Sequence, residues 1–331
     1  MDSPRWIRRA LGAGALVLAL ALAGCQAAPT AAPSPTASAA TTVPTPSETS
    51  VTVDTPTPPF DGGCAELLAD PGIAAATGGA TALQPGERWW IGIETAGGLD
   101  CPFDGARGYG HIIAVPADAA VSPGFDAPGC YQQYDEVECV STETVGGIWV
   151  LVALIGGELA PEVPDALVAL QAAASAALSD ADGVGVTARA STASLPLDCS
   201  ALADAVDVST LLAAEEVFSD RIEEGSGPLG RRVAEALGVS GRCDWSELTD
   251  FREFGVVVYP GAAWTWPGID LPEAEEVEVA GLDGLLSVDR HAGATLIVTD
   301  GVNLIEVRGS GVGREDLLAA AERITTAVSG A

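Results

Sequence analysis

Few residues in this 331-residue chain have the type and spacing that catalysis requires. Neither His111 nor His291 has a second histidine or a cysteine at a metal-ligand spacing, so ordinary structural roles are expected for both. Ser226 lies in Gly225-Ser226-Gly227, which falls short of the Gly-x-Ser-x-Gly turn that exposes a nucleophilic serine. The chain contains no lysine, which excludes Schiff-base chemistry and a Walker A phosphate loop.

A group of glutamates offers a second kind of chemistry, because two carboxyl groups across a cleft can hydrolyse a glycoside. The group consists of Glu273, Glu275, Glu276 and Glu278. Glu276 and Glu278 alternate with valines, and a period of two is typical of a strand with one solvated face. The pattern therefore favours a surface strand over an active site.

The aromatic residues are the better candidates for binding. Aromatic side chains are enriched at binding sites, where they stack on sugar rings or pack against a partner protein. Buried core positions explain most of these tryptophans, and a stacking surface is the remaining interpretation. The binding surface that it predicts consists of Trp89, Trp90, Tyr131, Tyr134, Trp264 and Trp266.

The N-terminal segment indicates where these residues act. Three arginines precede an apolar run over residues 10–24, which is shorter than the ~20 residues that a membrane-spanning helix needs. The run ends in Leu22-Ala23-Gly24-Cys25, which resembles the lipobox of bacterial lipoproteins. The resemblance implies cleavage of a signal peptide, residues 1–24, and acylation of Cys25 by groups such as palmitate, which anchors the chain to the outer face of the cell membrane. The alternative is an ordinary secretory signal with an unmodified cysteine.

Residues 25–60 are expected to form a tether. They are rich in proline, threonine, serine and alanine, and cannot bury enough apolar surface to fold. An extended polyproline conformation would reach on the order of 100 Å. The formal net charge of the whole chain is −31, and removal of the signal arginines makes it more negative. Such an acidic body is repelled by nucleic acid and by anionic lipid, so nucleic acid is not an expected partner.

The sequence after the tether contains an internal repeat. In each half a cysteine near the start is followed by a cysteine two residues before an aromatic residue, then by an apolar run that ends in proline, and last by a helix. The order of these features agrees, which predicts two similar domains over residues 61–180 and 195–331. The matched cysteines are Cys64 with Cys199 and Cys101 with Cys243.

The repeat also predicts the disulfides. The second half contains two cysteines, which are expected to pair with each other if that half folds by itself. The same pairing applied to the first half leaves its two extra cysteines for one another. A cysteine metal site would need a Cys-x-x-Cys or histidine spacing that the sequence lacks, and no metal or cofactor is expected. The predicted bonds are Cys64–Cys101, Cys130–Cys139 and Cys199–Cys243.

Hydrophobic patterns predict the same plan for each half: a short helix at the first cysteine, consecutive strands and a final helix. In the last helix Leu317, Ala321 and Ile324 recur at nearly helical spacing, so one stripe is expected to be buried. Such an order indicates the α+β class, with two tandem antiparallel sheets and flanking helices packed on one face of each. The predicted strands are residues 90–94, 110–115, 136–140, 148–155, 255–259, 276–279, 285–288, 295–299 and 303–308, with a hairpin turn at Asp300-Gly301.

A second resemblance concerns the two halves. A helix-borne cysteine with leucine three residues later, a Cys-x-aromatic strand and a terminal amphipathic helix, all behind a lipobox and tether, resemble actinobacterial lipoprotein domains of unknown function. The resemblance covers residues 61–178 and 195–331. It departs at Cys130 and Cys139, and at an apparent insertion over residues 215–241. It implies an extracytoplasmic binding or sensing module and no catalytic residue.

We therefore expect a non-catalytic binding or sensing protein of the cell envelope, held on the membrane by its lipid. Its expected partner is an envelope protein, a glycan or a small ligand. One alternative is an envelope hydrolase that acts on wall polymer or ester through Ser226 or the glutamates, chiefly Glu275 and Glu276. Another is a structural component of the envelope.

Overall fold

The computed structural model describes residues 63–83, 88–119, 129–133, 136–156, 163–179, 195–219, 228–289 and 293–329, together with Pro56 and Ala193. All of them lie in one unit, residues 50–331. The predicted signal peptide with Cys25, almost all of the predicted tether, and Tyr134, Ser226 and His291 lie outside the described residues. No helix among the described residues is both long and apolar enough to cross a membrane.

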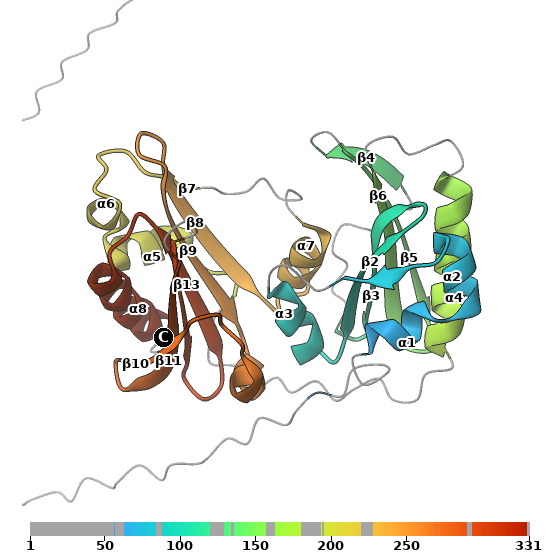
Figure 1. Cartoon of the computed structure of the whole chain (residues 1–331). Helices are drawn as coiled ribbons and strands as arrows, with labels where there is room; N and C mark the ends of the chain where they lie inside the picture. Colours follow the sequence, from blue (N-terminus) through green and yellow to red (C-terminus); the bar gives the residue numbers. More distant parts are fainter. Residues whose placement is uncertain are drawn as a thin grey trace, which may run out of the picture. The chain divides into compact units, whose positions relative to one another are not determined.

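The first half forms a six-stranded sheet in which every neighbouring pair is antiparallel, with the order β1-β2-β3-β6-β5-β4 (Figure 1). Its final helix, α4, packs with α2 beside this sheet. The strands are β1 (Thr81–Ala82), β2 (Leu99–Gly105), β3 (Gly108–Pro116), β4 (Gly129–Gln133), β5 (Glu136–Val145) and β6 (Ile148–Gly156), and the helices are α1 (Cys64–Leu68), α2 (Pro71–Thr77), α3 (Trp89–Thr95) and α4 (Val163–Ser179).

The second half forms a seven-stranded antiparallel sheet with the order β10-β11-β12-β13-β9-β8-β7. In both halves a hairpin, β2-β3 or β8-β9, pairs with the last strand of its own sheet, so the two topologies correspond and β10 is the additional strand. The strands are β7 (Phe218–Ser219), β8 (Gly241–Glu247), β9 (Arg252–Tyr259), β10 (Glu275–Val279), β11 (Leu282–Asp289), β12 (Gly293–Thr299) and β13 (Leu304–Ser310). The helices are α5 (Cys199–Val206), α6 (Val208–Leu211), α7 (Leu229–Ala236), η2 (Ala262–Gly268) and α8 (Arg314–Ser329).

Both faces of the first sheet are covered. On β6, Val150 and Val152 belong to the core that contains residues of α1, α2 and α4, while Trp149 and Leu151 belong to a second core on the opposite face. A strand buried on both faces has no polar side to alternate with, which explains the nearly continuous apolar sequence of β6.

Helices from both halves cover the second faces of the two sheets. Leu229 and Val233 of α7, from the second half, lie in the core on the outer face of the first sheet, which is the face opposite α4. Ile91 of α3, from the first half, lies in a core with Val257 of the second sheet. Helices α3 and α7 also contact each other. Each sheet therefore depends on a helix that the other half supplies.

The structure corrects the expectation of a strand at residues 90–94, which form most of helix α3. Trp89 and Ile93, four residues apart, face one core, and Ile91 faces the other. A helix that is apolar on all sides shows no amphipathic stripe, and its tryptophan and isoleucine content imitates a strand. The expectation that helices cover only one face of each sheet is also wrong. Helices α3 and α7 cover the second face of the first sheet, and α3 also packs on the second sheet.

The apparent insertion over residues 215–241 is also reinterpreted. It contains β7 and α7, which occupy the places in the second half that β1 and α3 occupy in the first. The remaining predicted strands are confirmed: they lie within β3, β5, β6 and β9 to β13, apart from Asn303, which precedes β13. The class expected from the sequence, α+β with two similar antiparallel sheets, is confirmed.

The three cysteine pairs expected from the repeat are bonded. The Cα atoms are 5.3 Å apart in Cys64–Cys101 and 5.4 Å apart in Cys199–Cys243, each of which joins the first helix of its half to the sheet. They are 4.0 Å apart in Cys130–Cys139, which joins β4 to β5.

Candidate functional site

The aromatic residues expected to form a binding surface make contacts inside the protein. The indole N–H of Trp89 donates to Asp100 Oδ2 at 3.0 Å, and that of Trp264 donates to Thr95 Oγ1 at 3.0 Å. Trp90 and Trp266 are half-buried against one core, and Tyr131 is half-buried at the edge of another. These contacts account for the residues as packing groups, and a binding role for the six aromatics stays a prediction.

A chain of polar groups lies on the outer face of the first sheet. His111 is 1% exposed, and its Nδ1 lies 2.9 Å from Oδ1 of the buried Asp100. The hydroxyl of Tyr109 lies 2.5 Å from the other ring nitrogen, Nε2. The tautomer that donates from Nδ1 to Asp100 and accepts at Nε2 from Tyr109 is assigned from the hydrogen-bond partners.

The order hydroxyl, histidine, carboxylate is that of a nucleophilic triad. The hydroxyl here is a phenol, however, and burial together with the charge of Asp100 raises the pKa of Tyr109 to about 12. Tyr109 is therefore held in its protonated form at neutral pH. These contacts agree with the structural role expected for His111.

A second polar group lies on the same face. Tyr131 and Glu138 are opposite each other on β4 and β5, and the Tyr131 hydroxyl donates to Glu138 Oε1. Arg232 of α7 is paired with the same carboxylate oxygen, and both of its Nη atoms lie 3.1 Å from the Tyr131 hydroxyl. Burial and the bond to Glu138 raise the pKa of Tyr131 to about 12. A carboxylate of the first half is thus neutralised by a guanidinium of the second.

Helix α7 approaches this face through Gly230. A Cβ atom at this position would overlap Trp89 Nε1 and Asp100 Oδ2, so the close approach requires glycine. At the start of α3, Arg88 Nη1 donates to the buried Glu306 Oε1 of the second sheet at 3.2 Å. Charges from both halves are therefore paired where α3 and α7 pack.

Glu94 of α3 gives this region a pH dependence. Burial, and secondarily the charge of Asp100, raises the pKa of Glu94 to about 7. The unfolded chain releases this proton near the ordinary glutamate pKa, whereas the native protein keeps it, so stability falls as pH rises from about 4.5 to 7 and the loss is complete above that.

The substitution Glu94→Gln should raise the free energy of unfolding by about 2–3 kcal/mol at pH 8 and by about 1 kcal/mol or less at pH 5. Urea denaturation at both pH values measures this; Glu278→Gln, at an exposed position of β10, is the matched control. An equal gain at both pH values would contradict the assignment.

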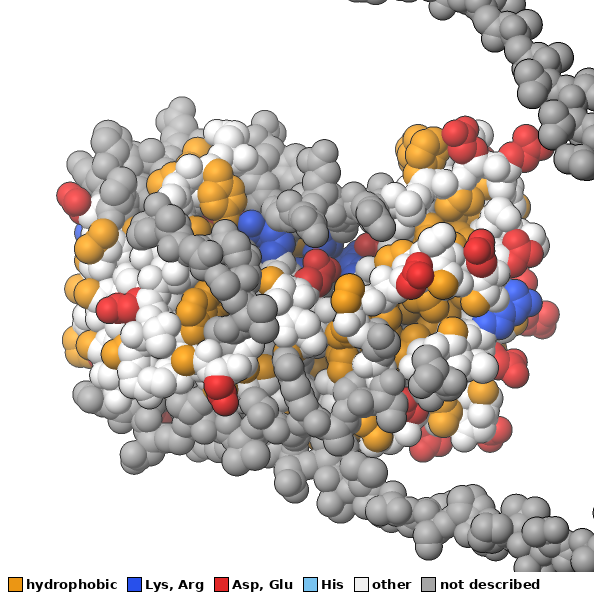
Figure 2. All heavy atoms as spheres, turned by 180° about the vertical axis from the view of Figure 1, so that it is seen from behind, with side chains coloured by type: hydrophobic (Ala, Val, Ile, Leu, Met, Phe, Trp, Pro, Cys, Tyr) orange, Lys and Arg blue, Asp and Glu red, His pale blue; other side chains and the backbone are white. Residues whose placement is uncertain are grey.

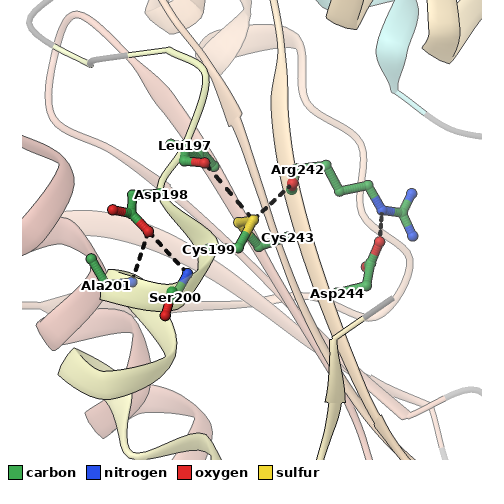
Figure 3. Close-up of a disulfide and its surroundings, with 8 residues drawn as sticks. All are labelled: Leu197, Asp198, Cys199, Ser200, Ala201, Arg242, Cys243 and Asp244. Carbon is green, nitrogen blue, oxygen red and sulfur yellow. Dashed lines mark hydrogen bonds and ion pairs between the residues drawn. A yellow bond between two sulfur atoms is a disulfide. The ribbon is translucent and has the colours of Figure 1, made fainter. Parts of the chain in front are cut away.

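An open groove lies on the second half, with a volume of about 480 Å³. It is formed by α5, α6, β7 and β8, and Trp245 contributes to its wall. Figure 3 shows how the start of α5 is fixed: the Cys199–Cys243 disulfide ties it to β8, and the Asp198 side chain caps the amides of Ser200 and Ala201. The polar lining consists of Ser200, Ser209, Ser219, Asp204 and Asp207.

Asp207 holds the turn between α5 and α6. It has a φ of 58°, accepts from the Thr210 amide at 3.5 Å and from the Ser209 hydroxyl at 3.1 Å, and these two bonds lower its pKa. This carboxylate is therefore ionised at neutral pH. Asp204 lies on the neighbouring turn of α5, so the groove presents carboxylates and hydroxyls from one side.

The glutamate group lies elsewhere. Glu276 and Glu278 are exposed on β10, the outermost strand of the second sheet, and alternate with Val277 and Val279, which pack toward the core, while Glu275 is exposed at the start of the strand. This is the alternation that the sequence predicts. Among the residues that the structure describes, no three histidine, cysteine or acidic side chains are grouped to hold a metal ion.

Sequence reasoning missed Asp100, Glu138 and Arg232. Asp100 and Glu138 share a signal, since each is a charged residue between two apolar ones, whereas Arg232 follows another arginine and shows no such signal. On the face drawn in Figure 2, acidic side chains are spread widely, whereas basic ones gather in few places, one of them a hollow that also holds acidic groups.

Comparison of the chain with protein-family models, with curated proteins and with solved structures finds no significant match.

Proposed function

We propose that the protein is a lipid-anchored, extracytoplasmic binding module of the cell envelope that takes its ligand in the groove beside α5 and does not convert it. The anchor and compartment rest on Leu22-Ala23-Gly24-Cys25 and on the tether that follows. Six paired cysteines support an oxidising compartment.

The groove is the observation that carries the binding role. Its volume of about 480 Å³ falls within the range of small-molecule sites, about 300–1,000 Å³. The first turn of α5 is fixed by a disulfide and a side-chain cap, so the site is formed before a ligand arrives. Preorganisation of this kind reduces the entropy lost on binding.

The lining defines the class of ligand. Serine hydroxyls both donate and accept hydrogen bonds, and the carboxylates of Asp204 and Asp207 accept only. An anionic ligand would be repelled by these carboxylates and by the acidic body as a whole. The groove therefore suits a small neutral or cationic molecule rich in hydroxyl or amine donors, such as a fragment of a wall glycan.

Three related sugars test this proposal by isothermal calorimetry on the purified full chain. Glucosamine is cationic, glucose is neutral and gluconate is anionic, and affinity should fall in that order.

Asp204→Asn should weaken glucosamine binding by about tenfold, since one charge-assisted contact is worth about 1.5–3 kcal/mol. Asp250→Asn, outside the groove, should leave it unchanged. Binding that favours gluconate, or that Asp204→Asn does not alter, would overturn the assignment of the groove, and release of a chemically altered sugar would overturn the non-catalytic role.

The anchor is tested separately. Cys25→Ser should move the protein from the membrane fraction to the soluble extracytoplasmic fraction, because the serine side chain offers no thiol for the lipid. Continued membrane attachment of the Cys25→Ser chain would contradict lipid anchoring and would leave the calorimetric result unaffected.

A further inference from the structure

The disulfide Cys130–Cys139 differs from the other two in its place in the fold. It joins residues directly opposite each other on β4 and β5, and β4 is the outermost strand of its sheet. The pair has no counterpart in the second half, where the cysteines are Cys199 and Cys243. It is therefore an addition to the repeated scaffold.

The neighbouring residue pair on the same two strands contacts α7 of the second half. Tyr131 and Glu138 are opposite each other, each adjacent in sequence to one of the two cysteines. Because successive residues of a strand face opposite sides, Cys139 lies in the core beneath the sheet while Tyr131 and Glu138 meet Arg232 of α7 above it. The disulfide thus joins the two strands at the residue pair next to Tyr131 and Glu138, which contact α7.

Exposure also sets this bond apart. Cys130 is exposed, whereas the first cysteine of each other pair is only half-exposed and their partners, Cys101 and Cys243, are buried. Thiol–disulfide exchange requires access of a thiolate to a sulfur atom, and of the six bonded cysteines only Cys130 is an exposed residue, so this bond is expected to be attacked first.

We infer that Cys130–Cys139 is a redox-sensitive latch that controls the docking of α7 on the first sheet. A dithiol outside the membrane attacks Cys130 Sγ as a thiolate, which breaks the Cys130–Cys139 bond, forms a mixed disulfide and releases Cys139 as a thiol. The second thiol of the reductant then displaces Cys130. Two electrons and two protons pass to the protein, which gains two thiols, and the reductant becomes a disulfide. With β4 held to β5 only by the backbone ladder from Gly129 to Gln133, Tyr131 separates more readily from the Arg232 guanidinium. This inference does not depend on the groove or on its ligand.

The test is a dithiothreitol titration of the purified full chain, with the freed thiols alkylated and identified by mass spectrometry. Cys130 and Cys139 should be labelled at a reductant concentration about tenfold lower than that needed for the other four cysteines. At that concentration, hydrogen exchange of the amides of α7 should accelerate by about tenfold. Simultaneous reduction of all three bonds, earlier reduction of another bond, or unchanged exchange in α7 would each overturn the inference.

Two variants separate a latch from a general loss of stability. Tyr131→Phe keeps the disulfide but removes the hydroxyl that meets Arg232, so it should accelerate exchange in α7 under oxidising conditions, and reduction should then add little. Cys199→Ser/Cys243→Ser is the matched control: because it lowers the stability of the whole chain and loosens α5, it should accelerate exchange most in α5, whereas Tyr131→Phe should accelerate it most in α7. The same exchange response in both variants would overturn the inference. The titration itself uses the native chain and so does not depend on either variant folding.

Discussion

Arg232→Met is expected to lower the free energy of unfolding by about 3–5 kcal/mol, because it leaves the Glu138 carboxylate buried without its cation. Glu138 is 2% exposed, and its charge is paired with the Arg232 guanidinium. Methionine has a similar length and replaces the packing of the arginine stem but not its charge. Guanidinium denaturation of the full chain at pH 7 measures the loss.

Two further variants define the cause. Arg314→Met breaks an ion pair with Glu275 whose side chains are 48% and 51% exposed, so it should change stability by about 1 kcal/mol or less. The double variant Arg232→Met/Glu138→Leu removes both buried charges and should recover most of the loss, since an apolar pair can replace a buried ion pair. A double variant as unstable as Arg232→Met would show that packing, and not the unpaired carboxylate, causes the effect.

Loss of the Cys199–Cys243 bond should have an effect of similar size. The bond closes a loop with a sequence separation of 44 residues, and chain entropy predicts a stabilisation of about 4 kcal/mol. Cys199→Ser/Cys243→Ser should therefore lower the denaturation midpoint strongly, and because the bond also fixes the start of α5, it should abolish ligand binding in the groove.

The first half supplies the comparison. Cys130→Ser/Cys139→Ser removes a bond with a sequence separation of 9, for which the same model gives about 3 kcal/mol or less. When both variants are measured beside the parent chain, the denaturation midpoint should be lower for Cys199→Ser/Cys243→Ser than for Cys130→Ser/Cys139→Ser. A smaller loss for Cys199→Ser/Cys243→Ser than for Cys130→Ser/Cys139→Ser would contradict the entropic account.

The proposed binding groove and the buried network at α7 lie in separate places. The groove lies on the side of the second half formed by α5 and α6, whereas α7 packs on the first sheet. The buried Arg232–Glu138 pair tolerates little displacement, because a separated charge loses its partner in a medium of low dielectric constant. Arg88 adds a second contact between the halves, at Glu306, which also pairs with Arg308 of its own strand. These contacts favour one arrangement of the two sheets, whereas the groove is lined by residues of the second half alone.

Much of the fold follows from local patterns in the sequence. The cysteine arithmetic and the repeat predict all three disulfides, and alternation such as that of Glu276 and Glu278 with valines predicts β10. These features depend on residues close together or on positions that the repeat relates. The groove lining was not predicted, because Ser219 and Asp204 come from separate elements that only folding brings together.

By itself, then, the sequence determines the α+β class, the two similar sheets and the cysteine pairing, since periodicity and composition act locally. Only the tertiary structure decides that residues 90–94 are helical, that α3 packs between the two sheets and α7 packs on the first one, and that Asp100 and the Glu138–Arg232 pair are buried. The physical reason is that burial on both sides erases the hydrophobic period from which a helix is recognised, and a charge is stable in the interior only beside a partner that the linear sequence does not reveal.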